Sequence, residues 1–416
     1  MAAVLVSGGV FYGLVYLLDF QEIDTTAKLD AKTLFDLVKL SFGVVAGAGA
    51  LVALVVAYRR QRVDEAGAQR EATRLHTDRF SQAVEQLGSD SPAVRLGGVH
   101  ALAGLADDAP DDSLRQTCID VLCAYLQLPF TPDPGDDPAH QEEHHRYLAF
   151  RKVRHTILRL IGDHYRRPRG AHRSWQGCDL DLNGVTIDGG LDFTAATFSG
   201  GVVSFRGATF SDGEVSFEHA KFSGGAVSFG GAAFSGGLVS FGGATFSDGE
   251  VSFNTAAFSG GFVNFGGARF SGGVVPFRDA RFSDGEVFFG GARFSDGDVS
   301  FSAARFSGGL VSFSGATFSG GVVSFSATFS DGEVSFREAA FSGGLMFFSG
   351  ATFSGGVVSF EGVRFSGHVV PFRGATFPGV SFDHTTGPAP DGLLDAVGTL
   401  PAATVTLPSA WRLSNP

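Results

Sequence analysis

The chain contains one short motif whose residue types could hold a metal, HQEEH at residues 140–144. The H-x-x-E-H spacing matches a zinc-protease pattern in which His140 and His144 would bind the metal and Glu143 would act as the base. That chemistry needs a long buried helix lining a cleft, whereas this motif follows an acidic, proline-rich loop, PFTPDPGDDPA. We therefore expect a solvated helix start, with glutamates near the positive end of the helix dipole, and neither catalysis nor metal binding.

The three cysteines, Cys118, Cys123 and Cys178, are too few for a disulfide framework, and their odd number fits a reducing compartment. Cys118 and Cys123 do not form a C-x-x-C motif, so we expect both to act as small core hydrophobes. No residue pattern in the sequence predicts a cofactor or a small-molecule substrate.

The net charge of the 416-residue chain is −12, which argues against general nucleic-acid binding. The main basic segment comprises RKVRH and RRPRGAHR within residues 151–173, and it could contact anionic lipid. Such a segment is more often a solvated helix face, which is the interpretation that we prefer.

Two apolar segments near the start of the chain predict membrane-spanning helices. Residues 1–18 carry no charge and have about the minimum length, since roughly 20 residues cross a ~30 Å hydrocarbon core. Residues 40–58 are also uncharged and end at the basic cluster RRQR, which is typical of a span rather than of a buried core helix. Positive charge stays on the cytoplasmic side, so we expect residues 19–39 to form an external loop and the bulk of the chain to be cytoplasmic. If residues 1–18 do not insert, only the N-terminus changes side.

After residue 58 the sequence becomes charged, and its apolar residues recur at helical spacing. The segments SDSP and DDAPDD break this region, with Ser91 as the expected N-cap of the helix between them. Further helices are expected over residues 114–128 and, roughly, 142–165. The apolar faces expected on these helices are Phe80, Val84 and Leu87; Val94, Val99, Leu102 and Leu105; and Val153, Ile157, Leu160 and Ile161.

The phenylalanines between Phe198 and Phe325 alternate in steps of seven and five residues; one residue is dropped in SATF, and the rhythm resumes to Phe377. The 12-residue consensus is F-S-[GD]-G-x-V-S-F-x-x-A-x, in which V-S-F and A-x-F alternate apolar and polar residues as short strands do. Such short strands are stable only when units stack about 4.8 Å apart. The glycine-rich SGG and SDG segments are expected to supply the turns, so the sequence predicts a mainly β protein, a parallel β-solenoid with a phenylalanine core.

The units V-S-F-x-G and A-x-F-S-G resemble pentapeptide repeats, whose central residue and the residue two before it point inward. The central residues would include Phe205, Phe210 and Phe217, with Val203, Ala208 and Val215 as their smaller partners. The resemblance implies a right-handed quadrilateral β-helix with four pentapeptides per coil. Because alternate pentapeptides are followed by a two-residue insertion, we expect about 24 residues per coil, with two tight and two widened corners. A 12-residue coil is the alternative.

The resemblance covers nearly the whole chain. The apolar hairpin ending in YRRQR, the segments RFSQAVEQLGSDSPAVRLGG, VRHTILRLIGDH and SWQGCDLDLNGVTIDGG, and the FSGG array are similar to the membrane-anchored pentapeptide-repeat proteins of actinobacteria. The expected domains are two transmembrane helices with a short external loop (1–58), a small cytoplasmic all-α domain (59–174), the solenoid (175–384) and a C-terminal cap and tail (385–416).

A tethered solenoid of this kind is expected to be a non-enzymatic scaffold that presents a rigid wall to a protein partner. The candidate interaction surface consists of Arg269, Arg281, Arg293 and Arg305, which occupy the outward position of A-x-F in consecutive units. If each coil holds two units, Arg269 would stack over Arg293, and Arg281 would stack over Arg305 on the opposite wall. Charges that merely solubilise a sheet surface are the alternative explanation.

Two other functions are alternatives to the scaffold. Some soluble pentapeptide-repeat proteins mimic DNA and occupy type II topoisomerases, and acidic corners such as Asp212/Glu214 and Asp248/Glu250 could support such a role. These corners would divide between opposite sides of the coil, and arginines interrupt them. A structural role in the cell envelope without a specific ligand is the other alternative. The array has no repeated His, Cys or paired carboxylates facing a cleft, so we do not expect an enzyme.

Overall fold

The computed structural model describes residues 9, 12, 13, 16, 31–129, 133–135, 137–366, 371–373, 375–376, 380–390, 393–397 and 405–411. The chain divides into two compact units, residues 1–77 and 78–416. The first expected membrane span, residues 1–18, lies outside the described residues except at four isolated positions. Phe377, the last residue of the phenylalanine rhythm, also lies outside them.

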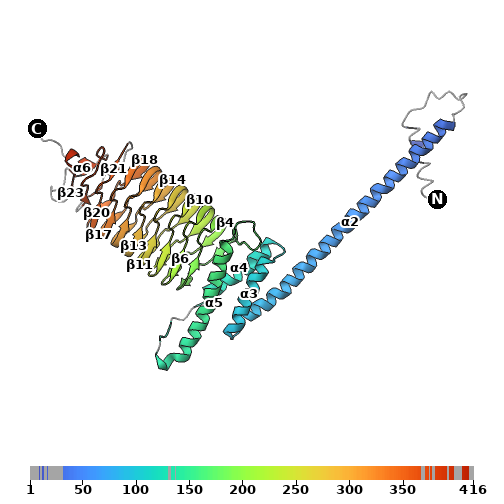
Figure 1. The fold of residues 1–416 in the computed structure, drawn as a ribbon, viewed down its shortest axis with the longest axis horizontal. Helices are drawn as coiled ribbons and strands as arrows, with labels where there is room; N and C mark the ends of the chain where they lie inside the picture. Colours follow the sequence, from blue (N-terminus) through green and yellow to red (C-terminus); the bar gives the residue numbers. More distant parts are fainter. Residues whose placement is uncertain are drawn as a thin grey trace. The chain divides into compact units, whose positions relative to one another are not determined.

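The first unit contains most of one long helix, α2 (Ala31–Leu87), drawn in blue in Figure 1. All of residues 40–58 belong to this helix, and its most apolar window has a mean hydropathy of 2.3 with only 6% of that window buried. Leu51, for example, is 65% exposed. By length and composition, α2 could cross a membrane.

The helices of the second unit after α2 are α3 (Pro92–Asp107), α4 (Asp112–Gln127), η1 (Pro138–His140) and α5 (Gln141–Tyr165). They lie within two residues of the expected positions, and Ser91 is the N-cap residue of α3, although its side chain makes no capping hydrogen bond. Cys118 and Cys123 are buried, and burial raises the pKa of these thiols to about 11 and about 12. Both cysteines therefore belong to the core, as expected.

The expectation was wrong for two residues on the helix faces, because Val84 is 37% exposed and Val94 is 42% exposed. The end of α2 crosses α3 at Gly98, where an added Cβ would lie 2.8 Å from the carbonyl oxygen of Ala83. This close approach turns Ala83 rather than Val84 toward the core, since adjacent helix positions point about 100° apart. Every other apolar residue expected to face inward is buried or half-buried.

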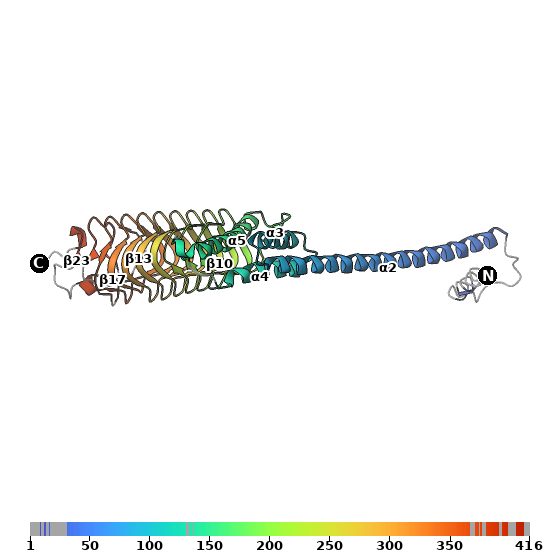
Figure 2. The same cartoon turned by 90° about the horizontal axis from the view of Figure 1, so that it is seen from below.

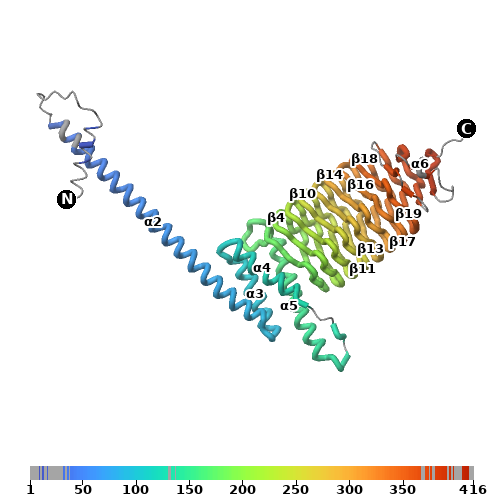
Figure 3. Tube along the Cα trace, turned by 180° about the vertical axis from the view of Figure 1, so that it is seen from behind, coloured from blue at the N-terminus to red at the C-terminus, as the bar shows by residue number. Residues whose placement is uncertain are grey.

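The solenoid consists of two sheets of parallel strands. The chain contributes strands to the two sheets in turn as it winds from coil to coil. The first sheet contains, in spatial order, β1 (Leu180–Asp181), β4 (Thr197–Ser204), β7 (Lys221–Ser228), β10 (Thr245–Ser252), β12 (Arg269–Pro276), β14 (Arg293–Ser300), β16 (Thr317–Ser324), β18 (Ala340–Phe347) and β21 (Arg364–Phe365). The second contains β2 (Thr186–Ile187), β5 (Thr209–Phe210), β8 (Ala233–Phe234), β11 (Ala257–Asn264), β13 (Arg281–Phe288), β15 (Arg305–Ser312), β17 (Thr328–Ser335), β20 (Val357–Ser359), β22 (Val380–Ser381) and β23 (Val405–Thr406), with β3 (Leu191–Asp192), β6 (Glu214–Ser216), β9 (Leu238–Ser240) and β19 (Thr352–Phe353) pairing beside that path. Figures 2 and 3 show the coils following one another along the solenoid.

The strand register settles the length of the coil. Phe246 pairs with Phe270, two 12-residue units further along the chain, and Arg281 pairs with Arg305 in the other sheet at the same interval. The strand pairs of the first sheet join β10 to β12 and β12 to β14, which skips the 12-residue unit between them. The predicted coil length of ~24 residues is therefore confirmed, and the 12-residue alternative is wrong.

Four columns of phenylalanine rings fill the interior. Rings one coil apart lie nearly parallel, as for Phe246 and Phe270, whose centroids are 4.7 Å apart with an interplanar angle of 3°. Rings from different columns meet edge to face, as for Phe253 and Phe265 at 5.7 Å and 80°. Each fully buried ring contributes roughly 1.5–3 kcal/mol of transfer free energy, which the short strands could not supply by hydrogen bonding alone.

Each coil has two kinds of corner. The tight corners are F-x-x-A turns, in which, for example, the amide of Ala208 donates to the carbonyl of Phe205 at 3.1 Å and Gly207 has a φ of 64°. The wide corners are the SGG and SDG segments, which lie inside continuous strands such as β10 and shift the register there. The expected widened corners are present. The expectation that SGG and SDG supply all the turns was incomplete, since the hydrogen-bonded turns are the F-x-x-A segments. These turns were not recognised from the sequence because F-x-x-A does not contain glycine in every copy.

The residue missing from SATF is removed from a tight corner. There the amide of Ala327 donates to the carbonyl of Phe325 at 2.7 Å, which closes a turn one residue shorter than the others. Phe329 still stacks on Phe306, with ring centroids 4.7 Å apart. The deletion therefore leaves the register of the core intact.

Aromatic residues lie at both ends of the phenylalanine columns. At the first coil, Tyr165 of α5 packs on Phe193 and Phe198, with centroids 5.6 Å and 5.4 Å away. At the last coils, Trp411 of η2 (Ser409–Trp411) packs on Phe365 and Phe382, each 6.0 Å away. The short helix α6 (Leu393–Val397) buries Leu393 in the same region.

Candidate interaction surface

The four arginines of the candidate surface form two pairs on different sheets. Arg269 of β12 is the register partner of Arg293 of β14, and Arg281 of β13 is the partner of Arg305 of β15. The predicted stacking is therefore confirmed. The arginines do not form one stripe of four.

The side chain of each arginine points to solvent because the residues before and after it, Ala and Phe, point into the core and side chains alternate along a strand. Arg269, for example, lies between the fully buried Ala268 and Phe270, and all four arginines are exposed. None of the four guanidinium groups has a hydrogen bond or ion pair with another residue that the structure describes. Like charges on neighbouring strands repel, so each pair costs free energy in the isolated protein.

The acidic corners are spread over both sheets. Asp248/Glu250 and Asp296/Asp298 belong to the first sheet, and Asp212/Glu214, Asp284/Glu286 and Asp331/Glu333 to the second. Within each sheet, uncharged corner residues separate them: Asp296 is opposite Ser271, and Asp284 is opposite Ser259. The expected division between opposite corners is confirmed, and neither sheet has a continuous acidic row in its described strands.

One exposed aromatic residue was not predicted from the sequence. Phe288 ends β13 at the position where most units have Ser, and it is 38% exposed. Its register partners are Asn264 and Ser312, both polar. The signal was the change from V-S-F to V-F-F at residues 287–289, which breaks the alternation that keeps phenylalanine inside.

The HQEEH residues are placed as the start of a helix. His140 belongs to η1 and precedes α5, whereas Glu142 and Glu143 are in the first turn of α5. Nδ1 of His144 lies 2.6 Å from Oδ1 of Asp133, and hydrogen bonds from the Gly135 amide and from His144 lower the pKa of that carboxyl. Among the described residues, no group of three or more His, Cys, Asp or Glu side chains could hold a metal ion.

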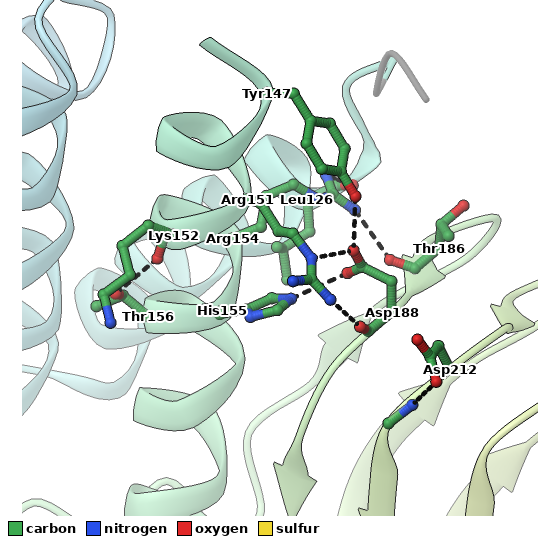
Figure 4. A network of polar contacts seen from close by, with 11 residues as sticks. Leu126, Tyr147, Arg151, Lys152, Arg154, His155, Thr156, Thr186, Asp188 and Asp212 are labelled. Atoms are coloured by element: carbon green, nitrogen blue, oxygen red, sulfur yellow. Dashed lines mark hydrogen bonds and ion pairs between the residues drawn. The ribbon is translucent and has the colours of Figure 1, made fainter. Parts of the chain in front are cut away.

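The basic segment packs partly against the first coil, so the expectation of a solvated face was wrong for Arg154, near the start of the segment. Arg154 is only 4% exposed and donates to the carbonyls of Leu126 and Thr186, at 2.7 Å and 3.1 Å. Figure 4 shows this arginine between helices and strands. The reason is tertiary: the helix turns this side of the basic segment toward carbonyls at the seam with the solenoid, which helical periodicity cannot reveal.

Asp188, just after β2, is the centre of a polar cluster at the same seam (Figure 4). Its carboxylate accepts from Nε of Arg151 at 2.7 Å and contacts Nε2 of His155 at 3.0 Å, and the hydroxyl of Tyr147 lies 3.4 Å away. Burial opposes ionisation of Asp188, but the bonds from His155 and Arg151 outweigh it and hold the pKa of the carboxyl well below its ordinary value. The cluster joins α5 to the first coil.

A second carboxylate, Asp107 at the end of α3, links the helices to the segment before β1. Its oxygens lie 3.1 Å from Nε2 of His164 and accept from Nε1 of Trp175 at 3.1 Å. His164 and Trp175 also stack, with ring centroids 4.1 Å apart. Both carboxylates are engaged in holding elements together, so we assign neither to catalysis.

Comparison with known proteins bears on the solenoid. The family described as pentapeptide repeats (nine copies) matches residues 182–229 and 347–386, near the two ends of the solenoid. No curated protein and no solved structure matches the chain. The same register continues between the matched segments, for example from Phe246 through Phe270 to Phe294. The match and the coil with two tight and two wide corners support a pentapeptide-repeat protein.

Proposed function

We propose that the protein is a non-enzymatic protein-interaction scaffold, tethered to a membrane, that presents the wall of its solenoid to a protein partner. The observation that carries the proposal is the two exposed arginine pairs, whose guanidinium groups form no ion pair with a described residue. Ionised carboxylates of a partner would relieve this repulsion and form charge-assisted hydrogen bonds with the guanidinium groups.

The rigidity of the wall favours the same role. Every described coil is tied to its neighbours by backbone hydrogen bonds and by stacked rings, so outward side chains keep fixed spacings without ordering on binding. The outward serines support a role without catalysis, because their hydroxyls bond to nearby backbone; Oγ of Ser228, for example, accepts from the amide of Gly230 at 3.3 Å.

The tether is part of the proposal. The exposed apolar part of α2 supports one membrane span, and RRQR after it favours the cytoplasm for the solenoid. A second span over residues 1–18 completes the proposed hairpin in the cell membrane.

The scaffold is tested by quantitative mass spectrometry of proteins that co-purify with the tagged full-length chain from membranes. The test variant replaces all four arginines by threonine: Arg269→Thr, Arg281→Thr, Arg293→Thr and Arg305→Thr. Threonine already occupies a rung next to Arg269, Arg293 and Arg305, and the small residue Ala257 occupies a rung next to Arg281. A control with the same change in net charge replaces four other outward cations, Arg206→Gly, Lys221→Thr, Arg278→Ser and Arg364→Ala.

Proteins lost with the test variant but retained with the control support the scaffold. A type II topoisomerase among them would instead favour a DNA mimic. Identical lists from all three proteins would refute recognition through the arginines and leave a structural role in the envelope.

A further inference from the structure

The two arginine pairs differ in their surroundings, and only one of them adjoins an exposed aromatic ring. Phe288 ends β13, the tight corner Phe289–Ala292 follows, and Arg293 begins β14. The phenylalanine and the arginine therefore lie on the two strands that flank this corner. Arg269 occupies the same position one coil earlier. We call Arg269, Arg293 and Phe288 the arginine–phenylalanine surface.

The corner between these side chains is bare backbone. Its turns in three successive coils are Gly242–Gly243, Gly266–Gly267 and Gly290–Gly291. A Cβ added to Gly267 or Gly291 would meet no atom within 4 Å, so the space above these two glycines is open.

The ring of Phe288 depends on these glycines for its position. A Cβ at Gly266 would lie 3.1 Å from Cε1 of Phe288, and a Cβ at Gly290 would overlap the ring. The ring therefore lies over the first glycine of two successive turns and leaves the second glycine of each uncovered. Glycine here makes room both for the aromatic side chain and for a ligand beside it.

We propose that the arginine–phenylalanine surface binds an extended acidic segment of a partner protein in which acidic and apolar side chains alternate. The inference rests on the proposed scaffold function and names the chemistry of its partner. Successive side chains of an extended segment point to opposite sides, so a segment along the corner directs acidic residues to Arg269 and Arg293 and the intervening residue to Phe288. Arg269 and Arg293 lie on neighbouring rungs about 4.8 Å apart, and acidic side chains two positions apart in an extended segment are ~7 Å apart, a difference that the long arginine side chains can span.

Charge complementarity decides the occupant. Arg269 and Arg293 occupy neighbouring rungs, and neither guanidinium group forms an ion pair with a described residue, so paired carboxylates of a partner would neutralise both. Arginine is also enriched among the few residues that dominate the binding free energy of protein interfaces.

The other arginine pair provides a matched control within the same chain. Arg281 and Arg305 have the same stacking, but the residues equivalent to Phe288 before them are Pro276 and Ser300. The corner before Arg281 carries Arg278 and Asp279 instead of two glycines. Arg281 and Arg305 thus carry the same charge, but they lack both the open glycine corner and the exposed aromatic ring.

The test measures binding of a fluorescent, acetylated peptide, Gly-Glu-Leu-Glu-Gly, to full-length protein in detergent by fluorescence polarisation. Arg269→Thr/Arg293→Thr should weaken binding about tenfold or more, whereas Arg281→Thr/Arg305→Thr should change it less than about twofold. Phe288→Ser should weaken it by roughly threefold to tenfold. Thr and Ser already occupy neighbouring rungs, which protects the fold.

A second peptide, Gly-Glu-Gly-Glu-Gly, tests the apolar contact. If leucine contacts Phe288, this peptide binds more weakly and Phe288→Ser weakens it no further. Equal weakening by both arginine double variants, no binding by the unchanged protein, or equal binding of Gly-Lys-Leu-Lys-Gly would overturn the inference. So would binding of phosphatidylglycerol vesicles through Arg269 and Arg293 without binding of the peptide.

Failure of this inference differs from failure of the scaffold. If co-purifying proteins are lost with the four-arginine variant while the peptide does not bind, the scaffold stands and the partner segment has another chemistry. If co-purification is unchanged as well, both proposals fall.

Discussion

Replacing Gly273 with alanine is expected to disrupt the solenoid locally, whereas the same replacement at Gly267 in the same coil is expected to be mild. Both glycines have a positive φ, 70° and 66°. Gly273 belongs to a wide corner, where an added Cβ would lie 2.6 Å from the carbonyl oxygen of Gly249 in the previous coil. Gly267 belongs to a tight corner, where an added Cβ would meet nothing within 4 Å.

The comparison separates two costs. An L residue with positive φ costs about 1–2 kcal/mol, and this cost is common to both variants. The overlap with the previous coil adds about 1–3 kcal/mol at Gly273 alone. The structure already accepts side chains at the equivalent of Gly267, since Thr255 and Ala303 have φ values of 59° and 57°. We therefore expect about 2–5 kcal/mol for Gly273→Ala and about 1–2 kcal/mol for Gly267→Ala.

Hydrogen exchange of the full-length protein, read by mass spectrometry on peptides from β10, β12 and β14, measures this difference. A local readout is needed because coils of a repeat protein open independently and a single melting midpoint is not defined. Exchange in Gly273→Ala should be about tenfold or more faster than in Gly267→Ala, since about 1.4 kcal/mol corresponds to a factor of ten. Equal exchange in the two variants would refute the argument that contact between coils, rather than φ alone, requires glycine at wide corners.

Three further outcomes follow from the contacts. Arg154→Met should destabilise the second unit by about 2–3 kcal/mol in urea titrations, because the buried carbonyl of Leu126 and the part-buried carbonyl of Thr186 lose their donor. Arg159→Met, on the exposed side of α5, should change the stability by less than about 0.5 kcal/mol. Folding lowers the pKa of Asp188, so the ionised carboxylate stabilises the protein above the unfolded pKa of 3.8, and this stabilisation is lost as the pH falls below 3.8. In Asp188→Asn, the midpoint of urea unfolding should therefore depend less on pH between pH 5 and 2 than it does in the wild type. If α2 crosses a membrane, Leu51→Asp should move the protein from carbonate-washed membranes to the supernatant, because a central aspartate costs about 2.5–3.5 kcal/mol, while Val63→Asp beyond RRQR should not. A flat response of the wild-type midpoint to pH, or equal fractionation of the two α2 variants, would contradict the corresponding reasoning.

The core could be predicted because its information is local and repeated. Phe246 and Phe270 lie in similar contexts one coil apart, so a period read along the chain becomes a contact in space. The tight corners were harder, because their third residue is His219 or Thr255 in some copies and glycine in others, and a hydrogen bond rather than a residue type defines them. Periodicity therefore predicts the interior better than the corners.

The seam between the helices and the first coil could not be predicted, because it joins residues far apart in the chain that have no shared period. Arg154 is an ordinary member of a basic segment until its partners, Leu126 and Thr186, are known. Asp188 likewise resembles an acidic turn residue, and only the approach of Arg151 and His155 makes it a half-buried, ionised link between α5 and the first coil. Such contacts depend on the docking of a helix, which the sequence of either partner alone does not specify.

The length of the coil also limits how this solenoid can build a binding surface. Because one coil contains two 12-residue units, a residue that recurs in every unit is divided between the two sheets, as the four arginines are. A surface on one side must therefore come from features that occur once per coil or break the repeat. Phe288 breaks it on one side only, and it does so where glycine turns leave the neighbouring corner open. If recognition by this wall is specific, it should depend on such departures from the repeat rather than on the repeat itself. Exchange of Phe288 and Ser312 between their rungs should then abolish the peptide site, because Ser314 occupies the position equivalent to Gly290 and leaves no room for the ring.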